Sequence, residues 1–226
     1  MTRQLTFDLP VRPALGRDDF FVSPDNALAL SVLENWQNWP NAMLVLVGPK
    51  GAGKTHLAHV WAAATGARML RADDLQSVDL DEDLDEDLRA QPVIVEDIDT
   101  PDLNEEALFH LHNFLRASGC SVLFTSGSAP AHLTLRLPDL ASRLEAVSVA
   151  TLDPPGDELL RAVLLKQFAD RQLSVPPNLV PYLLGRIERS FAAVQDIVAT
   201  LDDAALAQGR PVSRALAASI LDKDTP

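Results

Sequence analysis

One segment constrains the fold of this chain more than any other: Gly48-Pro49-Lys50-Gly51-Ala52-Gly53-Lys54-Thr55. It follows the apolar run 42–47 and precedes a stretch in which apolar residues recur at helical spacing. The spacing Gly-x-x-x-x-Gly-Lys-Thr is typical of a phosphate-binding loop, because its glycines let backbone N–H groups turn toward a phosphate chain. The segment therefore predicts a P-loop between a buried strand and a helix. A glycine turn without a ligand is the weaker alternative.

The chemistry of a P-loop assigns roles to nearby side chains. Lys54 is expected to reach the outer phosphates and Thr55 to bind Mg²⁺, while the start of the following helix adds a positive dipole. A second apolar run, 93–95, ends at Glu96 and Asp97. We expect Glu96 to hold the magnesium ion and Asp97 to orient an attacking water. A surface acidic pair without a catalytic role is the alternative interpretation.

The arrangement of apolar runs predicts the architecture. Strand and helix patterns alternate from residue 42 to about 149, which is typical of an α/β fold with a three-layer parallel sheet. From residue 154 the strand pattern stops, and four helices are expected over 157–171, 178–189, 191–207 and 213–221. The chain thus divides into a polar N-terminal tail (1–20), an α/β nucleotide-binding core (21–152) and a C-terminal helical lid (153–226).

Composition limits the surroundings in which such a chain can work. The net charge of −13 argues against direct binding to DNA phosphates. No apolar stretch approaches the roughly 20 residues that span a bilayer, and the N-terminus lacks the apolar segment of a signal peptide. A single cysteine, Cys120, cannot support a disulfide framework, so we expect a buried structural thiol in a cytoplasmic protein.

Several motifs resemble a known family. The run Gly53-Lys54-Thr55-His56-Leu57, with Phe21-Val22 upstream and Glu96-Asp97-Ile98 downstream, is similar to the DnaA family of AAA+ proteins. The run Leu137-Pro138-Asp139-Leu140-Ala141-Ser142-Arg143-Leu144 resembles the shorter Hda branch of that family, whose members switch DnaA off. The resemblance covers about residues 4–221.

The resemblance also implies a difference from DnaA itself. DnaA carries a further C-terminal helix-turn-helix domain that reads DNA, whereas this chain ends at Pro226, just after the predicted lid. We therefore expect a protein without that domain, in keeping with its acidic charge.

The resemblance extends the set of candidate site residues. It implies an adenine pocket at Phe21 and Val22, a nucleotide site over residues 48–55 that continues to His56, and a polar sensor at Thr125-Ser126, where Ser126 is the candidate catalytic contact. Arg143 matches the family's arginine finger, which reaches into the nucleotide site of a neighbouring subunit. An ordinary surface salt bridge is the alternative for Arg143.

Two positions depart from the family pattern. Glu96 stands where the family usually has the shorter Asp, and Ala192 stands where the lid of DnaA and Hda carries an arginine that points at the phosphates. Arg189, three residues earlier, is a candidate substitute. Gly127 also replaces a longer polar residue. These departures predict weak hydrolysis at the chain's own site.

The N-terminal tail carries a further motif, Gln4-Leu5-Thr6-Phe7-Asp8-Leu9. It resembles the peptide by which Hda and other proteins dock on the sliding clamp of DNA polymerase III. In an extended peptide, Leu5, Phe7 and Leu9 lie on one side as apolar anchors, while Gln4 is free for polar contacts. An edge strand of the protein's own sheet would show the same pattern.

Together these features predict a regulatory adaptor. The resemblance implies that the protein binds ADP or ATP with Mg²⁺, docks on the sliding clamp and presents Arg143 to DnaA, so that DnaA hydrolyses its ATP and initiation of replication is restrained. DNA would be reached only through the clamp. Two alternatives stay open: a stand-alone AAA+ ATPase such as a helicase loader, and an interaction module stabilised by bound nucleotide. The sequence also leaves self-association open.

Overall fold

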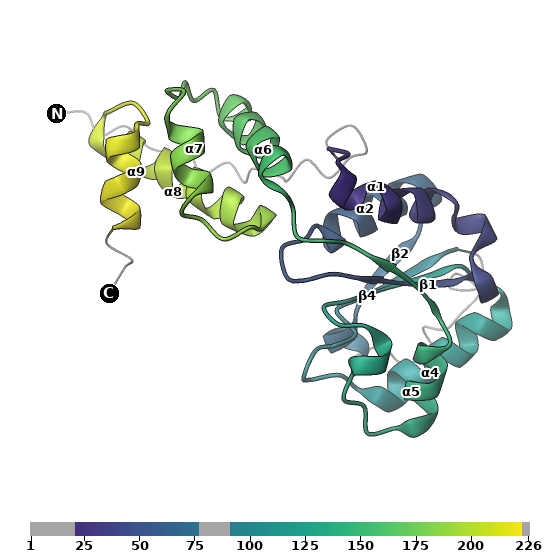
Figure 1. Ribbon diagram of the computed structural model, residues 1–226. Helices are drawn as coiled ribbons and strands as arrows, with labels where there is room; N and C mark the ends of the chain where they lie inside the picture. The colour runs from purple at the N-terminus through teal and green to yellow at the C-terminus, as the bar shows by residue number, and fades with distance from the viewer. Residues whose placement is uncertain (1–20, 77–90, 223–226) are drawn as a thin grey trace, which may run out of the picture.

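The computed structural model describes residues 21–76 and 91–222 of the chain. The predicted clamp motif, residues 4–9, lies outside these ranges, as does the acidic run 79–87. Figure 1 shows the described residues as an α/β body with a group of four helices at one side, the last part of the chain in yellow and green. The parallel sheet and the C-terminal helices confirm the fold class expected from the sequence.

The α/β body is built on a parallel sheet in which the described strands follow the order β2-β3-β4-β1-β5. All four strand pairings are parallel, so the carboxyl ends of the strands meet at one edge of the sheet. Loops at that edge are where open α/β sheets bind ligands. The strands are β1 (Met43–Val47), β2 (Arg68–Arg71), β3 (Val93–Glu96), β4 (Val122–Ser126) and β5 (Ser148–Thr151).

Helices cover both faces of the sheet (Figure 1). The side chains of the central strand β1 alternate between two cores: Val45 packs with the cluster of α4 and α5, whereas Leu44 and Leu46 pack with that of α1 and α2. Because both faces are buried, β1 is apolar throughout and not alternating. The covering helices are α1 (Pro24–Glu34), α2 (Lys54–Thr65), α4 (Glu105–Ser118) and α5 (Pro138–Glu145).

Local sequence signals fix the ends of these helices. Ser23 caps α1, with its backbone N–H donating to the side chain of Asn26, and the Asn104 side chain caps α4 by accepting from the Ala107 N–H. Gly66 ends α2 at φ 73°, a left-handed conformation that favours glycine. Short 3₁₀ turns connect the elements: η2 (Trp36–Asn38), η3 (Pro40–Ala42), η4 (Ala72–Gln76) and η5 (Pro130–His132).

The lid has a hydrophobic core of its own. Phe168 of α6, Leu183 of α7 and Val198 of α8 are buried together in it. The lid helices are α6 (Asp157–Asp170), α7 (Leu179–Leu184), α8 (Phe191–Gln208) and α9 (Arg214–Leu221). Within the described ranges, none of the helices combines the length and apolar character needed to cross a bilayer.

The second lid helix is shorter than predicted. The expected helix 178–189 ends at Leu184, and Gly185 follows it. Glycine is a poor helix former, and the amides of Arg186 and Ile187 both turn back to the Leu183 carbonyl. The residues up to Ser190, the N-cap of α8, form the connection between the two helices.

Two elements of the core carried no separate prediction. Helix α5 holds the Arg143 motif, and the edge strand β5 buries only one of its four residues, Ala150. An edge strand with one buried side chain lacks the continuous apolar run that identified β1 and β3.

Candidate nucleotide-binding site

The predicted P-loop lies at the carboxyl edge of the sheet, directly after β1. Its backbone enters the left-handed region at Gly51 (φ 79°) and Gly53 (φ 101°), where a side chain would be strained. The Gly48 N–H donates to the Ser126 carbonyl oxygen at 3.1 Å, which fastens the loop to β4. Helix α2 then begins at Lys54.

The start of α2 offers positive charge without an internal counter-ion. Within residues 21–76 and 91–222 no side chain caps the helix, and its first turn contains no acidic residue. Lys54 Nζ donates to the Gly48 carbonyl oxygen at 2.7 Å and lies 3.3 Å from that of Pro49. A phosphate in the loop would offer Lys54 a charged partner in place of these neutral carbonyls, and charge-assisted hydrogen bonds are the stronger kind. The loop therefore fits an anionic ligand.

A carboxylate and a hydroxyl suitable for Mg²⁺ flank the loop. Glu96, the last residue of β3, is buried, and its Oε1 atom makes no hydrogen bond within the described part of the chain. Thr55, the second residue of α2, has an exposed side chain. Magnesium takes oxygen ligands and usually keeps waters and substrate phosphates among them. Glu96 and Thr55 fit as the protein's share of such a site, and Mg²⁺ there would neutralise charge on bound phosphates.

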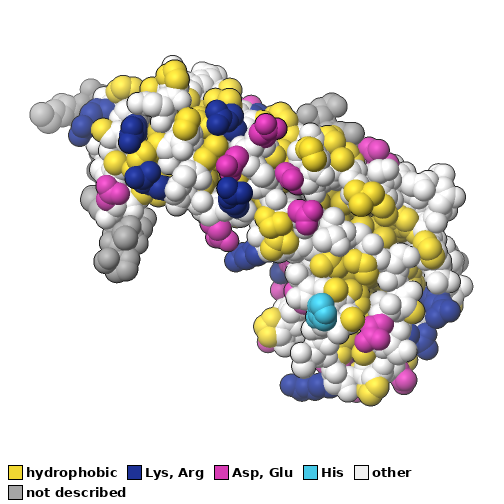
Figure 2. Space-filling view, viewed as in Figure 1, with side chains coloured by type: hydrophobic (Ala, Val, Ile, Leu, Met, Phe, Trp, Pro, Cys, Tyr) yellow, Lys and Arg dark blue, Asp and Glu magenta, His cyan; other side chains and the backbone are white. Residues whose placement is uncertain are grey.

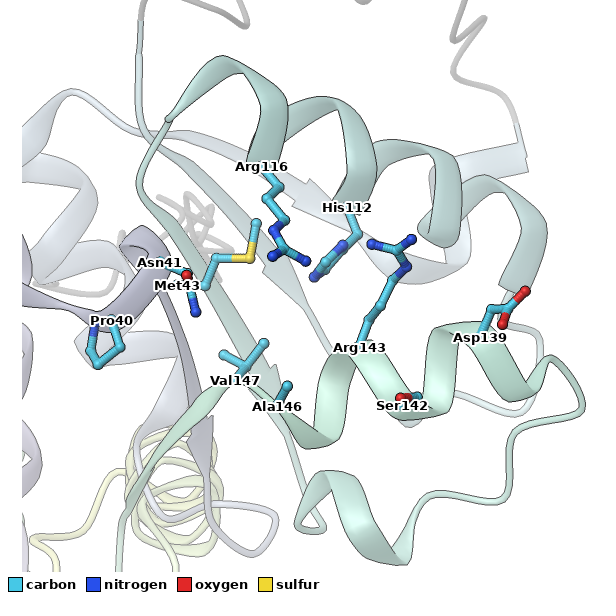
Figure 3. Close-up of a pocket in the computed structure, with 10 residues that line it drawn as sticks. All are labelled: Pro40, Asn41, Met43, His112, Arg116, Asp139, Ser142, Arg143, Ala146 and Val147. Carbon is cyan, nitrogen blue, oxygen red and sulfur yellow. The ribbon is translucent and has the colours of Figure 1, made fainter.

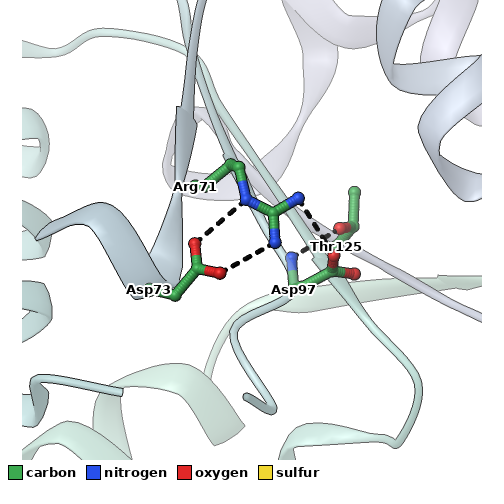
Figure 4. A network of polar contacts seen from close by, with 4 residues as sticks. All are labelled: Arg71, Asp73, Asp97 and Thr125. Carbon is green, nitrogen blue, oxygen red and sulfur yellow. Dashed lines mark hydrogen bonds and ion pairs between the residues drawn. The ribbon is translucent and has the colours of Figure 1, made fainter. Parts of the chain in front are cut away.

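Asp97 is held in an unusual backbone conformation beside Thr125. Its φ is 57°, and its N–H donates to Thr125 Oγ1 at 2.9 Å (Figure 4). The Asp97 carboxylate is about half exposed and lies 4.0 Å from the Arg71 guanidinium. Strained residues of this kind cluster at functional sites. The buried Thr125 thus positions Asp97 at the carboxyl edge of the sheet.

Arg71 is engaged mainly by a different carboxylate. It donates two hydrogen bonds to Asp73, at 3.0 and 2.9 Å (Figure 4). This pairing raises the pKa of Arg71 and lowers the pKa of Asp73. Because Asp73 occupies the fork of the guanidinium, the Asp97 carboxylate pairs with Arg71 only at the longer distance of 4.0 Å.

The other predicted sensor residue turns toward its own loop. Ser126 is fully buried; its hydroxyl donates to the Ser128 carbonyl oxygen at 2.7 Å and accepts from the Ser128 N–H at 3.2 Å. Next to it, the Gly127 N–H donates to Asp99 at 2.9 Å. Of the pair predicted as the sensor, Thr125 contacts Asp97, whereas Ser126 contacts the P-loop through its backbone.

The lid meets the P-loop directly, a contact that no local sequence signal predicted. The Phe191 N–H, at the start of α8, donates to the Gly51 carbonyl oxygen at 3.0 Å. A Cβ atom added to Gly51 would lie 2.3 Å from Ser190 Cβ, and one added to Gly53 would lie 3.0 Å from the Phe191 ring. Glycine at these two positions therefore allows the lid to pack against the loop, in addition to allowing the left-handed backbone of the loop.

Among the described residues of the lid, no arginine is hydrogen-bonded to this loop. Ala192 is exposed and has only a methyl group. Arg189, the candidate substitute, has its guanidinium 3.0 Å from the Asp157 carboxylate at the start of α6. In this arrangement Arg189, in the connection between α7 and α8, pairs with the first residue of α6, and Ser190 and Phe191 lie against the loop instead.

The predicted adenine segment lies next to the entrance of the lid. Phe21 and Val22 are 37% and 53% exposed, unusually accessible for large apolar side chains beside a core. Buried Asn26 donates to the Phe21 carbonyl oxygen at 2.8 Å. Asp25 accepts a hydrogen bond from the Gly156 N–H at 3.0 Å and so joins the start of α1 to the start of the lid. The remaining nucleotide candidates surround the loop, with Pro49 and Lys50 exposed, Ala52 buried and His56 half-buried.

Arg143 lies apart from all these residues. It is half-buried on α5, and its guanidinium sits 5.1 Å from the centre of the Phe109 ring on α4. It lines a pocket of about 350 Å³ together with Met43, the first residue of β1 (Figure 3). The P-loop follows the last residue of β1, so Arg143 and the loop lie at opposite edges of the sheet.

Solved structures of low sequence identity share this fold. No model of a known protein family matches the chain. It has the α/β fold of AAA+ domains, with a five-stranded parallel sheet and C-terminal helices. Domain III of the replication initiation protein DnaA from Thermotoga maritima superposes with a TM-score of 0.77 at 20% identity, covering 96% of this chain and 100% of that chain.

Two longer proteins match as well. AMPPCP-bound DnaA from Aquifex aeolicus gives a TM-score of 0.69 at 16% identity, with 84% of this chain and 66% of that chain covered. The RuvB Holliday junction branch migration motor of Thermotoga maritima gives 0.60 at 15% identity, covering 80% and 61%. This chain thus spans about two thirds of that DnaA chain and a little less of the RuvB chain.

Proposed function

We propose that this protein is a nucleotide-binding AAA+ adaptor of the Hda type, which promotes hydrolysis of ATP held by DnaA and thereby restrains initiation of replication. Its own P-loop would hold ADP or ATP with Mg²⁺ through Lys54, Thr55 and Glu96. The fold match to DnaA, one example of which holds AMPPCP, supports an adenine nucleotide as the ligand.

The position of Arg143 carries the proposal. Arg143 lies at the edge of the sheet opposite the P-loop, too far around the domain to serve its own nucleotide. Among the described residues it makes no ion pair with a carboxylate, which argues against the structural salt bridge considered above. An unpaired guanidinium near the surface is suited to the charge that develops on a phosphoryl group bound by another chain.

Features of the chain's own site argue for an adaptor over a motor. Ala192 supplies no cation to the phosphates, Arg189 is paired with Asp157, and Lys54 is hydrogen-bonded to its own loop. A site of this kind suits nucleotide retention better than fast turnover. The stand-alone ATPase stays as the second candidate, favoured by the buried and unpartnered Glu96 oxygen beside strained Asp97.

Docking on the sliding clamp through residues 4–9 completes the proposal. The chain has a net charge of −13, and Figure 2 shows basic and acidic side chains interspersed among the described residues of one face, without a continuous basic surface. Electrostatic attraction to DNA is therefore a poor means of recruitment. A peptide that binds the clamp would bring the protein to replicating DNA without contacts to phosphates.

The decisive experiment measures hydrolysis of DnaA-bound ATP in the presence of DNA-loaded clamp, with and without this protein. We expect the wild type to stimulate hydrolysis and Arg143→Ala to lose most of that stimulation. An arginine finger can contribute roughly 10³–10⁵-fold in rate, so its removal should account for most of the effect. Arg136→Ala, an exposed arginine near α5, is the matched control. Equal stimulation by Arg143→Ala and wild type would reject the role of Arg143.

A further inference from the structure

The pocket that contains Arg143 has features that the proposed finger does not use. It opens between α4 and α5 at the amino edge of the sheet and encloses about 350 Å³. Its polar side is formed by His112 and Arg116 of α4 and by Arg143 of α5. Figure 3 shows the His112 imidazole between the two guanidinium groups.

The positive charge in this pocket is not balanced by the described residues. Neither Arg116 nor Arg143 has a carboxylate within ion-pair distance among them. Asp139, in the first turn of α5, also lines the pocket, but Figure 3 shows its carboxylate apart from the guanidinium groups and it too makes no ion pair in the described part of the chain. Two unpaired arginines converging on one cavity create a positive potential that favours an anion.

His112 lines the same cavity with a nearly buried imidazole ring. The side chain is only 2% exposed and stacks on Phe124 of β4, with ring centroids 6.3 Å apart. Its Nδ1 atom is buried and has no hydrogen-bond partner among the described residues. The ring thus lies packed between the two guanidinium groups that line the cavity. The nearest charged groups to the imidazole are Arg116, Arg143 and, farther along α5, Asp139.

We propose that the pocket between α4 and α5 is a binding site for a small phosphate-type oxyanion, held by Arg116 and Arg143 with the imidazole of His112 between them. The guanidinium forks supply geometry suited to phosphate oxygens, and an imidazole of His112 that carries a proton adds positive charge beside them. The cavity is roomy enough for a phosphate ester, whose organic part would lie against Met43 and Val147.

Such an anion would alter the protonation of His112. Burial first, and then the charges of Arg143 and Arg116, lower the pKa of His112 to about 4, while a hydrogen bond with Asn113 opposes the shift. A bound dianion would offset the two arginine charges and favour the imidazolium form. Binding would therefore take up a proton and strengthen as the pH falls.

This site is independent of the proposed function, although the two share Arg143. An anion in the pocket would engage the guanidinium within its own chain and so withhold it from a nucleotide on a neighbouring chain. The source of the oxyanion also distinguishes the two ideas: a free small molecule for the pocket, and a nucleotide held by another protein for the finger.

Imidazole signals in a long-range ¹H–¹⁵N NMR spectrum provide the test. The full chain without nucleotide is titrated with inorganic phosphate at constant ionic strength, and His112 is assigned with His112→Gln. We expect the chemical shifts of His112 to change and reach a plateau as phosphate is added, whereas the chemical shifts of exposed His110 should show no plateau. The titration is repeated in Lys54→Ala, where the P-loop is disabled, and the His112 response should be unchanged.

Variants and pH decide the composition of the site. Arg116→Ala and Arg143→Ala should each weaken phosphate binding by about tenfold or more, since each removes a charge-assisted contact, while Arg136→Ala should change it less than about twofold. With sulfate, whose charge is constant over this range, affinity should rise as the pH falls from 7 to 5.

Three results would overturn the site: no saturable His112 shift at tens of millimolar phosphate, equal weakening by Arg136→Ala, or a shift seen only when a nucleotide-loaded partner is added. The last result would leave Arg143 to the role of a finger alone.

Discussion

Lys54 Nζ lies 2.7 Å from the carbonyl oxygen of Gly48, so that the lysine of the P-loop is hydrogen-bonded to the first residue of the same loop. In this arrangement the Lys54 ammonium group donates hydrogen bonds to neutral backbone carbonyl oxygens. A phosphate that enters the loop must displace these contacts, and it can do so because it offers a full negative charge.

The first prediction concerns this lysine. Lys54→Ala should leave the free protein folded but remove most of the rise in melting temperature that ADP or ATP with Mg²⁺ produces in the wild type, because stabilisation by ligand scales with affinity. Differential scanning fluorimetry measures both. Lys166→Ala, which removes a lysine paired with Asp170 on α6, serves as the control. Absence of any thermal shift in the wild type at millimolar nucleotide would contradict nucleotide binding.

The second prediction concerns the contact between loop and lid. Gly51 and Gly66 have similar φ values, 79° and 73°, but a Cβ atom meets Ser190 at 2.3 Å at the first position and open space at the second. Gly66→Ala should therefore cost only the backbone strain, about 1–2 kcal/mol. Gly51→Ala should cost more and weaken nucleotide binding. Urea unfolding of both variants makes the comparison, and equal losses would show that the lid does not press on the loop.

The third prediction concerns the metal ligand. Glu96→Gln should abolish the part of the nucleotide-induced thermal shift that requires Mg²⁺, because an amide is a poorer ligand than a carboxylate. The stability of the nucleotide-free protein should not fall, since Glu96 Oε1 has no hydrogen bond to lose. Glu188→Gln, an exposed residue of the lid, is the control. In the same samples, wild-type ATP turnover without partners should be slow; brisk turnover would favour the stand-alone ATPase.

The fourth prediction concerns the N-terminal motif. Gln4→Ala combined with Leu5→Ala should eliminate binding to the sliding clamp, because a few anchors carry most of the energy of an interface. Nucleotide binding should survive, as residues 4 and 5 precede the core. Surface plasmon resonance on immobilised clamp measures the loss, and a synthetic peptide of residues 1–12 should compete. Clamp binding that is unchanged in the double variant would favour an edge strand over a docking peptide.

The fifth prediction concerns pH. The pKa of His112 is lowered to about 4 in the folded protein, against about 6.5 for an unfolded histidine. Only the unfolded chain takes up this proton between pH 7 and pH 5. The free energy of unfolding should therefore decrease by about 2 kcal/mol as the pH is lowered from 7 to 5. His112→Gln should lose that part of the dependence. Chemical unfolding at both pH values measures it, with His110→Gln as the exposed control.

The local structure around the predicted P-loop could be predicted because its signals are local. The P-loop, the strand before it and the helix after it are consecutive in sequence, and Glu96 and Asp97 follow directly on a buried apolar run. The parallel sheet and the lid helices followed from hydrophobic periodicity in the same way. The helix expected over 178–189 was too long because the pattern did not register Gly185 as its end.

The contacts between distant segments could not be predicted in this way. Gly51 and Ser190 lie far apart in sequence, and only the packing of the lid brings them together. His112 and Arg116 share one face of α4, a spacing that can be read from sequence. That Arg143 joins them depends on how α5 packs against α4, for which no local pattern exists.

The hydrogen bond between the Phe191 N–H and the Gly51 carbonyl joins backbone to backbone, so of the substitutions at position 191 only proline, which lacks the N–H, deletes its donor. Helix α8 extends from this point for 18 residues, a rod about 27 Å long. A tilt of about 5° at its pivot on the loop would displace its far end by about 2 Å, following from that length. The contact with the loop would thus be the pivot of α8. A small rearrangement around a bound phosphate would then move the outer end of the lid by a distance large enough for a partner to detect.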